Sequence, residues 1–259
     1  MITQLYEIQT SDEAEKLIDL GIDHIGSVIV SEESWKITEI YETIRTVENS
    51  ANSKSSLIPL YSNRDAVFKT IDYYKPDILH FCDSLANHHG IYNHCNKLIY
   101  LQEVVKESYP EIKIMRSIPL LQTGLSAKIA FLELSRLFEP VSDYFLTDTL
   151  LTENNSVTEK EQPVEGFIGI TGKTCDWDMA ETLVEESNIP VILAGGLSPE
   201  NVAAGIIKVG PSGVDSCTLT NAVDENNRPI RFKKDYKLVK SFIVEARRAV
   251  NTDFSQTRI

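Results

Sequence analysis

Residues 171–202 read TGKTCDWDMAETLVEESNIPVILAGGLSPENV, and this stretch decides the fold that we expect. Residues 191–194 form a short apolar run of the kind that a buried parallel strand requires. Gly195 and Gly196 follow directly, and glycine lets backbone amides approach a ligand where a Cβ would obstruct. Residues 198–200, Ser-Pro-Glu, read as N-cap, first helical residue and first-turn acid. The stretch therefore predicts a strand, a glycine turn and a helix whose N-terminus can bind an anion.

Outward from this stretch, apolar strand-like runs alternate with amphipathic helical runs, the pattern of βα units around a parallel sheet. The expected strands are 4–8, 24–30, 56–61, 77–81, 113–118, 144–147, 191–194 and 213–217. The expected helices are 12–20, 37–47, 65–74, 98–108, 127–137, 177–186, 199–208 and 234–249. Eight strands predict an α/β fold, a single (β/α)8 TIM barrel, with an open doubly wound sheet as the alternative.

Length and composition fit one barrel domain. A chain of 259 residues with 42% hydrophobic content can bury one substantial core, so we expect a barrel over 1–251 and a C-terminal tail over 252–259. No apolar run approaches the roughly 18 residues of a membrane span and the start has no signal-peptide core, so we expect a cytoplasmic protein without a membrane partner. The net charge of −13 argues against a nucleic-acid partner, and the four cysteines lack a CxxC pairing and read as reduced thiols.

A family resemblance rests on several pieces of the C-terminal third. ILAGGLSPENV, preceded by TGKTCDW and followed by GVDSCTLT and KKDYKLVKSFI, resembles the phosphoribosylanthranilate isomerase family. With gaps, the resemblance runs from residue 4 to residue 248. It implies a barrel enzyme of tryptophan biosynthesis that performs an Amadori-type aldose-ketose isomerisation of a phosphoribosyl amine, with no cofactor and no metal.

The resemblance also implies where the ligand binds. It places a phosphate at the ends of the last two strands, where Gly195, Gly196 and Thr218 can direct backbone amides at one anion. It places Gly172 and Lys173 near the substrate, because the corresponding loop borders the substrate in the family. The alternative for the glycine pair is that it only closes a tight turn.

Asp148 is the candidate general acid. It follows the apolar run 144–147 at a strand end, where the resemblance places the acid of the family. An Amadori rearrangement requires protonation of the sugar ring oxygen, for which a carboxylic acid in a partly dry pocket is suited. The alternative is an exposed aspartate that caps the next turn.

The candidate base departs from the family pattern. The family begins with Lys-Ile-Cys-Gly, whose cysteine is the general base, and residues 4–7 here are Gln-Leu-Tyr-Glu. Tyr6 therefore stands at the base position, although an ordinary phenol has a pKa of about 10 and is a poor base at neutral pH. Glu7 is expected on the opposite side of the strand, or near the barrel mouth if it lies beyond the end of the strand. Either another residue acts as base or the reaction is different.

Two further positions concern substrate binding. Ser34-Trp35-Lys36 stands where the family has Ser-Pro-Arg, so Lys36 keeps the positive charge that meets the anthranilate carboxylate but lacks the guanidinium fork. His80 retains the histidine of the family's Gln-Leu-His-Gly, within Ile-Leu-His-Phe. The phosphate half of the site thus resembles the family more than the catalytic half does.

A cluster of histidines and cysteines offers potential zinc ligands: His80, Cys82, His88, His89, His94 and Cys95. Their spacing matches no closed zinc site, so we favour a solvated loop and expect no metal. The segment 82–97 and the polar segment 149–169 are longer than simple connections need. The second reads as a lid or an insertion, and its GFIGI end can add a short strand outside the barrel.

Three functions remain open at this point. They are a phosphoribosylanthranilate isomerase with a substituted base, a barrel enzyme that acts on another phosphorylated sugar, and a noncatalytic sugar-phosphate sensor. In each, the partner is a phosphorylated small-molecule ligand, and the oligomeric state stays open.

Overall fold

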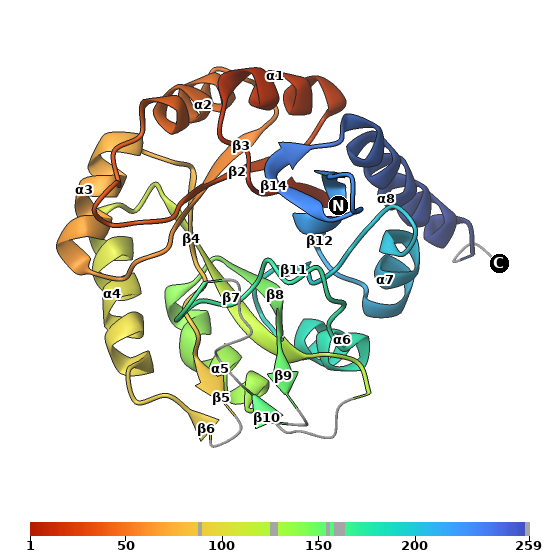
Figure 1. Cartoon of the computed structure of the whole chain (residues 1–259). Coiled ribbons are helices and arrows are strands. Elements are labelled where there is room, and N and C mark those ends of the chain that lie inside the picture. The colour runs from red at the N-terminus through yellow and green to blue at the C-terminus, as the bar shows by residue number, and fades with distance from the viewer. Residues whose placement is uncertain (88–89, 125–128, 154–155, 158–163, 257–259) are drawn as a thin grey trace.

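Eight parallel strands close into a barrel (Figure 1) in the computed structural model, which describes residues 1–87, 90–124, 129–153, 156–157 and 164–256. The hydrogen-bonded order is β1-β12-β11-β8-β7-β4-β3-β2. β1 pairs in parallel with β12 on one side and with β2 on the other, which closes the sheet. The TIM barrel prediction is confirmed, and the open doubly wound sheet is excluded.

The barrel strands begin within two residues of their expected starts. They are β1 (Ile2–Leu5), β2 (His24–Ile29), β3 (Lys54–Pro59), β4 (Ile78–Phe81), β7 (Lys113–Leu121), β8 (Tyr144–Leu150), β11 (Val191–Leu193) and β12 (Gly213–Ser216). The helices form an outer ring: α1 (Ser11–Leu20), α2 (Thr38–Glu48), α3 (Arg64–Tyr74), α4 (Cys95–Ser108), α5 (Phe131–Phe138), α6 (Trp177–Glu186), α7 (Val202–Val209) and α8 (Tyr236–Gln256). α8 continues to Gln256, whereas we expected the tail to begin at residue 252.

Shorter elements lie outside the barrel. They are the 3-10 turns η1 (Glu139–Val141) and η3 (Thr218–Thr220) and three two-stranded ribbons, β5 (Ala86–Asn87) with β6 (Gly90–Ile91), β9 (Thr152–Glu153) with β10 (Ser156–Val157), and β13 (Asn221–Val223) with β14 (Pro229–Lys234). Among the described residues, no helix is both long enough and apolar enough to cross a membrane.

The helix after the glycine pair begins later than expected. α7 starts at Val202 rather than at residue 199, so the prediction that Ser198 is its N-cap is wrong. Asn201 holds the intervening turn, because its side chain accepts from the Ser198 amide at 2.8 Å and donates to the Gly196 carbonyl at 2.9 Å. The Ser198 carbonyl accepts the Val202 amide at 3.0 Å and so leads the turn into the helix.

The two faces of the barrel sheet pack in separate apolar clusters. One cluster fills the interior and contains Tyr6, Val28, Ile58, Leu60, Ile78, Cys82, Met115, Leu146, Ile192 and Ala194. Residues adjacent to these in sequence, such as Leu5 and Leu193, belong to clusters that include helix residues. This alternation follows from the two-residue period of a strand and directs every second side chain into the barrel.

The ring of Tyr6 occupies space that only a glycine leaves free on β2. A Cβ at Gly26 would lie 2.0 Å from Cδ1 of Tyr6, well inside van der Waals contact. Gly26 lies on β2, and Tyr6 directly follows β1, which pairs with β2, so neither residue can move away without disturbing the sheet.

We expect Gly26→Ala to lower the free energy of unfolding by about 1–3 kcal/mol, as overpacked cores do, and urea denaturation measures this. The same substitution should lower it much less in a Tyr6→Ala background, where the ring is gone. An equal loss in both backgrounds would show that the contact with Tyr6 is not the cause.

Candidate active site

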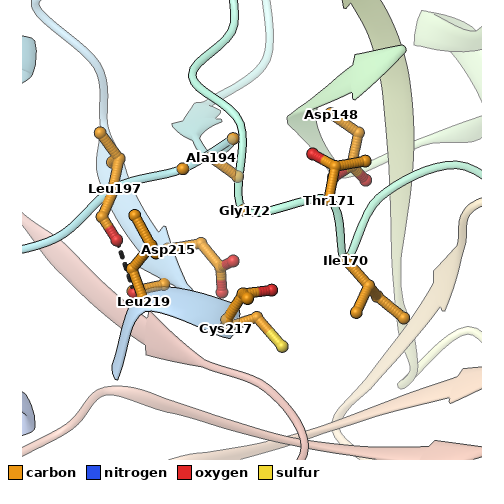
Figure 2. Close-up of a pocket in the computed structure, with 13 residues that line it drawn as sticks. Asp148, Ile170, Thr171, Gly172, Ala194, Leu197, Asp215, Cys217 and Leu219 are labelled. Atoms are coloured by element: carbon orange, nitrogen blue, oxygen red, sulfur yellow. Dashed lines mark hydrogen bonds between the residues drawn. The ribbon is translucent and has the colours of Figure 1, made fainter. Parts of the chain in front are cut away.

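A cavity opens at the carboxyl ends of β8, β11 and β12, the end of a TIM barrel that carries active sites (Figure 2). Asp148, residues 170–172, residues 194–197 and residues 215–219 form its wall. It holds about 340 Å³ of empty space and is open to solvent. Because much of the wall is glycine-rich turn, we call it the glycine cavity.

Residues predicted to bind the phosphate, and one of the two predicted to lie near the substrate in the same region, meet at the glycine cavity. Gly172, Gly195, Gly196 and Thr218 all line it, although they come from three separate segments. The side chain of Lys173 is exposed, and Lys173 does not line the cavity. The structure thus assembles four of these five residues around one space.

The glycine pair is also required by the turn itself. Gly195 and Gly196 have φ angles of 90° and 58°, a region that favours glycine. A Cβ on Gly195 would lie 2.4 Å from Oγ1 of Thr149, and one on Gly196 would lie 2.6 Å from the carbonyl carbon of Lys173. Turn closure and ligand approach are therefore compatible explanations of the same residues.

We expect inorganic phosphate to bind in the glycine cavity, between the Gly195–Gly196 turn and Thr218, because glycine turns and adjacent amides form anion sites. Thr218→Asp should abolish phosphate binding measured by calorimetry, since it places a negative charge in the wall. Ser241→Asp, at an exposed position on α8, makes the same charge change away from the cavity and should leave binding intact. Equal weakening by both variants would place the anion elsewhere.

A second cavity adjoins the first and is mainly apolar. It encloses about 430 Å³ of non-atom space, part of which is open solvent. Its apolar wall consists of Val28, Ile58, Leu60, Leu146, Ile168 and Ile170, and Tyr6 and His80 also line it. We call it the apolar cavity. Asp148, Ile170, Asp215 and Cys217 line both cavities, so these four residues mark the junction.

Asp148 lies at this junction and is a carboxylic acid with a raised pKa. Ser117 Oγ lies 2.5 Å from its Oδ2 and donates a hydrogen bond to the carboxylate form. Burial raises the pKa of Asp148 to about 7, and the hydrogen bond from Ser117 opposes this rise. A group that titrates near neutrality is able to release a proton during catalysis.

Asp215 is a second such acid, and it was not among the residues expected at the site. It lies on β12, and Gln4 Nε2 donates a hydrogen bond to its Oδ1 at 3.2 Å. Burial and then the charge of Asp148 raise the pKa of Asp215 to about 7, while Gln4 and Lys234 oppose this. The available signal was an acidic residue near the end of a predicted strand, two residues before Cys217 and three before Thr218.

Tyr6 and His80 connect to Asp148 through a chain of hydrogen bonds. The Tyr6 hydroxyl lies 2.6 Å from Ser56 Oγ and 2.8 Å from His80 Nδ1. His80 Nε2 lies 2.8 Å from Ser117 Oγ, which contacts Asp148. Burial raises the pKa of Tyr6 well above 10 and lowers the pKa of His80 to about 3. Both side chains are therefore neutral near pH 7, and the protonated phenol argues against Tyr6 as a base.

Lys36 lies away from both cavities. Its Nζ is 4.6 Å from the centroid of the Tyr73 ring on α3, and Lys36 is exposed. Neither cavity has Lys36 in its wall. Its predicted contact with a substrate carboxylate stays a prediction, and a movement of the loop before α2 would be needed to make it.

Glu7 has an unusual environment for a charged residue. Its φ of 69° is in the region that favours glycine, the residue at this position in the family pattern. The side chain is fully buried, and Arg231 Nε from β14 donates to its Oε1 at 2.6 Å. Asn221 and the Phe232 amide donate to the other oxygen. This network ties the β13-β14 ribbon to the end of β1, beside the apolar cavity.

The segment that ends the long 149–169 connection lies across the barrel mouth. Phe167 forms an isolated antiparallel bridge with Asp83, and the Ile168 amide donates to the Cys82 carbonyl at 2.9 Å. The expected extra strand is thus a single bridge. A Cβ at Gly169 would lie 2.8 Å from Asp148 Oδ1, so glycine allows the chain to pass this acid. Residues 154–155 and 158–163 of the connection lie outside the described residues.

The histidine and cysteine cluster is divided among several environments. His80 and Cys82 line the apolar cavity, His94 Nε2 lies 3.0 Å from the Ser84 carbonyl, and Cys95 Sγ donates to Leu85. Within the described part of the chain, no three His, Cys, Asp or Glu side chains are placed to hold a metal ion. His88 and His89 lie outside the described residues.

Sequence comparison identifies relatives of part of the chain. The family profile described as N-(5′-phosphoribosyl)anthranilate (PRA) isomerase matches residues 144–244. N-(5′-phosphoribosyl)anthranilate isomerase 2 of Methanosarcina mazei is 32% identical over 148 residues, 54% of this chain and 58% of the relative. The Aquifex aeolicus isomerase is 47% identical over 75 residues, 29% of this chain and 33% of the relative. The chain spans about half the length of the M. mazei relative and of the isomerase from Methanocella arvoryzae, at 58% and 54%.

Solved structures match the barrel over nearly the whole chain. Phosphoribosyl anthranilate isomerase from Thermotoga maritima has a TM-score of 0.65 at 18% identity, covering 95% of this chain and 99% of that one. An isomerase solved with reduced 1-(o-carboxyphenylamino)-1-deoxyribulose 5-phosphate has a TM-score of 0.64 at 17% identity, with the same two coverages. At these identities the solved structures show the fold alone.

Proposed function

We propose that this chain is an N-(5′-phosphoribosyl)anthranilate isomerase, which opens the sugar ring of its substrate and isomerises the aldose amine to a ketose by an Amadori rearrangement. The observation that carries the proposal is the junction of the glycine cavity and the apolar cavity, where two carboxylic acids with pKa values near 7 meet. The substrate matches this arrangement of two cavities and a junction. It has a phosphate at one end, an aryl amine at the other and the reacting carbons between them.

The two cavities suit the two ends of this substrate. The phosphate binds in the glycine cavity, where Gly195, Gly196 and Thr218 present backbone to an anion. The anthranilate ring binds in the apolar cavity, whose aliphatic wall favours an aromatic ring. The complex of a related isomerase with the reduced deoxyribulose phosphate supports this choice of ligand class. The ribose then lies at the junction, beside Asp148 and Asp215.

Asp148 is the general acid of the proposed reaction. Its proton goes to the ring oxygen as the bond from that oxygen to C1 breaks, and the amine nitrogen supplies the electron pair that forms the iminium. Ser117 orients the carboxyl group through the 2.5 Å hydrogen bond. Gly169 passes directly over the acid and limits its contact with water.

The chain performs this reaction without the family's cysteine base. Tyr6 stands at that position in the resemblance, and β1 directs it into the barrel interior, as the cysteine position requires. The thiols nearest the site are Cys82 and Cys217, and burial raises the pKa of both above the ordinary value of a thiol. A thiolate is therefore not available near neutrality.

The proposal is tested with purified protein and freshly generated phosphoribosylanthranilate, by following the loss of the substrate's anthranilate fluorescence. We expect saturable turnover, and we expect the gene to restore growth of a tryptophan auxotroph that lacks the isomerase. Asp148→Asn is the negative control for contaminating host enzyme. Binding of the reduced deoxyribulose phosphate without turnover would favour a sensor, and turnover of a different phosphorylated sugar alone would favour another barrel enzyme.

A further inference from the structure

We infer that Asp215, at the carboxyl end of β12, is the general base that removes the C2 proton of the substrate. This inference rests on the proposed function and adds to it the residue that replaces the missing cysteine. Three observations lead to it. Asp215 lies at the same height along the barrel axis as Asp148, it lines both cavities at their junction, and the other titratable groups there are protonated or already hydrogen-bonded.

The strand register brings Asp215 level with Asp148. β11 pairs Ile192 with Leu146 on one side and with Gly213 on the other. Two residues further along each strand, Ala194 stands between Asp148 and Asp215. Neighbouring strands lie about 4.8 Å apart, so the two Cα atoms are about 10 Å apart with both side chains directed inward. A sugar carbon skeleton fits between two such carboxyl groups.

Both acids reach the same space. Figure 2 shows the side chains of Asp148 and Asp215 entering the glycine cavity from different strands, and both also line the apolar cavity. A ligand with phosphate in one cavity and aryl ring in the other passes between them. C1 and C2 of its sugar are the carbons nearest the aryl amine, so they lie at this junction.

The surroundings of Asp215 favour one shared proton between the two acids. The titratable groups that line the junction or act on Asp215 are Tyr6, Glu7, His80, Cys82, Asp148, Cys217 and Lys234. The Lys234 ammonium donates to the Cys217 carbonyl at 2.8 Å and favours the ionised form of Asp215. Two nearby carboxylates in a poorly solvated space resist ionising together, so one is an acid while the other is a base.

The other candidates at the junction are unsuited to the role. The Tyr6 phenol and the Cys82 and Cys217 thiols are protonated at neutral pH because burial raises the pKa of each. His80 has both ring nitrogens within 2.8 Å of a hydroxyl oxygen. Glu7 has both carboxylate oxygens occupied by Arg231, Asn221 and the Phe232 amide. Among the side chains of the described residues, only Gln4 donates a hydrogen bond to the Asp215 carboxylate, at 3.2 Å to Oδ1, which leaves Oδ2 for substrate.

The reaction balances with these two groups alone. After Asp148 protonates the ring oxygen and the iminium forms, the Asp215 carboxylate takes the proton from C2. The electron pair of the C2–H bond becomes the C1–C2 double bond, and the pair of the C–N double bond returns to nitrogen. Asp215 then delivers its proton to C1 while the Asp148 carboxylate takes the proton of the 2-hydroxyl, which yields the ketone and restores both starting states.

The test compares Asp215→Asn with Asp148→Asn and with Asp19→Asn, a control at an exposed position on α1. We expect Asp215→Asn to lower kcat about 10²-fold or more, the range for loss of a general base, and Asp19→Asn to retain the wild-type kcat. The Kd for the reduced deoxyribulose phosphate should change by less than about 3-fold, since that analogue needs no proton transfer. With substrate deuterated at C2, the isotope effect on kcat should rise in Asp215→Asn and not in Asp148→Asn.

Other outcomes overturn the inference. If wild type turns over the substrate and Asp215→Asn keeps more than about a tenth of its kcat, Asp215 is not the base. If kcat and analogue affinity fall together with no change in the isotope effect, Asp215 binds the sugar instead. Should Asp215→Asn fail to fold, Asp215→Glu keeps the charge but displaces the carboxylate, and an unchanged kcat there would reject the role. Absence of wild-type turnover is a different result, because it rejects the proposed function itself.

Discussion

Replacing Asp148 with asparagine should lower kcat for phosphoribosylanthranilate by about 10²-fold or more, while the Kd of the reduced deoxyribulose phosphate stays within about 3-fold. The substitution keeps the size of the side chain and the oxygen that Ser117 contacts at 2.5 Å. It removes the only property the ring-opening step requires, which is a transferable proton. Stopped-flow fluorescence measures the chemical step, and calorimetry measures binding.

The pH dependence of stability gives an independent check on Asp148. Its folded-state pKa of about 7 lies above the ordinary value of 3.8, so folding favours the protonated form. This contribution to stability is fully present below about pH 4 and is lost as pH rises toward 7. Asp148→Asn has no such loss, so its melting temperature should exceed that of wild type at pH 8 and equal it at pH 4.

Two results would contradict the assignment of Asp148. Turnover by Asp148→Asn close to the wild-type rate would remove it from the mechanism. A lower melting temperature of the variant at pH 8 would mean that the carboxylate stabilises the fold, as a structural aspartate does, and that its pKa is not raised.

Asp83→Asn should be the most destabilising of the substitutions considered, with a loss of about 3–5 kcal/mol in the free energy of unfolding. Arg116 on β7 is fully buried, and its Nη1 donates to Asp83 Oδ2 at 2.9 Å. Its Nε donates to Gln102 at 2.7 Å, and the guanidinium lies 4.7 Å from the centroid of Phe138. Without the Asp83 charge, the buried guanidinium loses the carboxylate that offsets its lost hydration.

The control for Asp83→Asn is an exposed ion pair. Glu186→Gln breaks the 3.1 Å contact with Arg136, in which the side chains are 52% and 69% exposed, and should cost less than about 1 kcal/mol. Chemical denaturation measures both variants. The double variant Asp83→Asn with Arg116→Met should recover part of the loss, because no buried charge remains. If Asp83→Asn cost no more than Glu186→Gln, solvent would have to reach Arg116.

The overall fold follows from local patterns along the chain. Alternating apolar runs and amphipathic helices predict eight strands and eight helices, because strand and helix periods are properties of short segments. The position of Asp148 at a strand end and the glycine pair after 191–194 are equally local features. All eight predicted strands are present, and the pairing of β1 with β12 closes them.

Element ends were less well determined. α7 begins three residues after the expected position because Asn201 and Ser198 satisfy each other in a turn, although Ser-Pro-Glu is a strong signal for a helix start. Competing caps that lie three residues apart differ by little in free energy, so the local sequence does not choose between them.

By itself, the sequence determined the barrel, the strand that carries Asp148 and the glycine turn beside it. Only the tertiary structure decided that Asp215 joins Asp148, that Lys36 lies on Tyr73, and that Glu7 pairs with Arg231, 224 residues further along the chain. The physical reason is that periodicity specifies which face of a strand is buried, whereas the partner that a side chain meets depends on how closure and register align strands far apart in sequence.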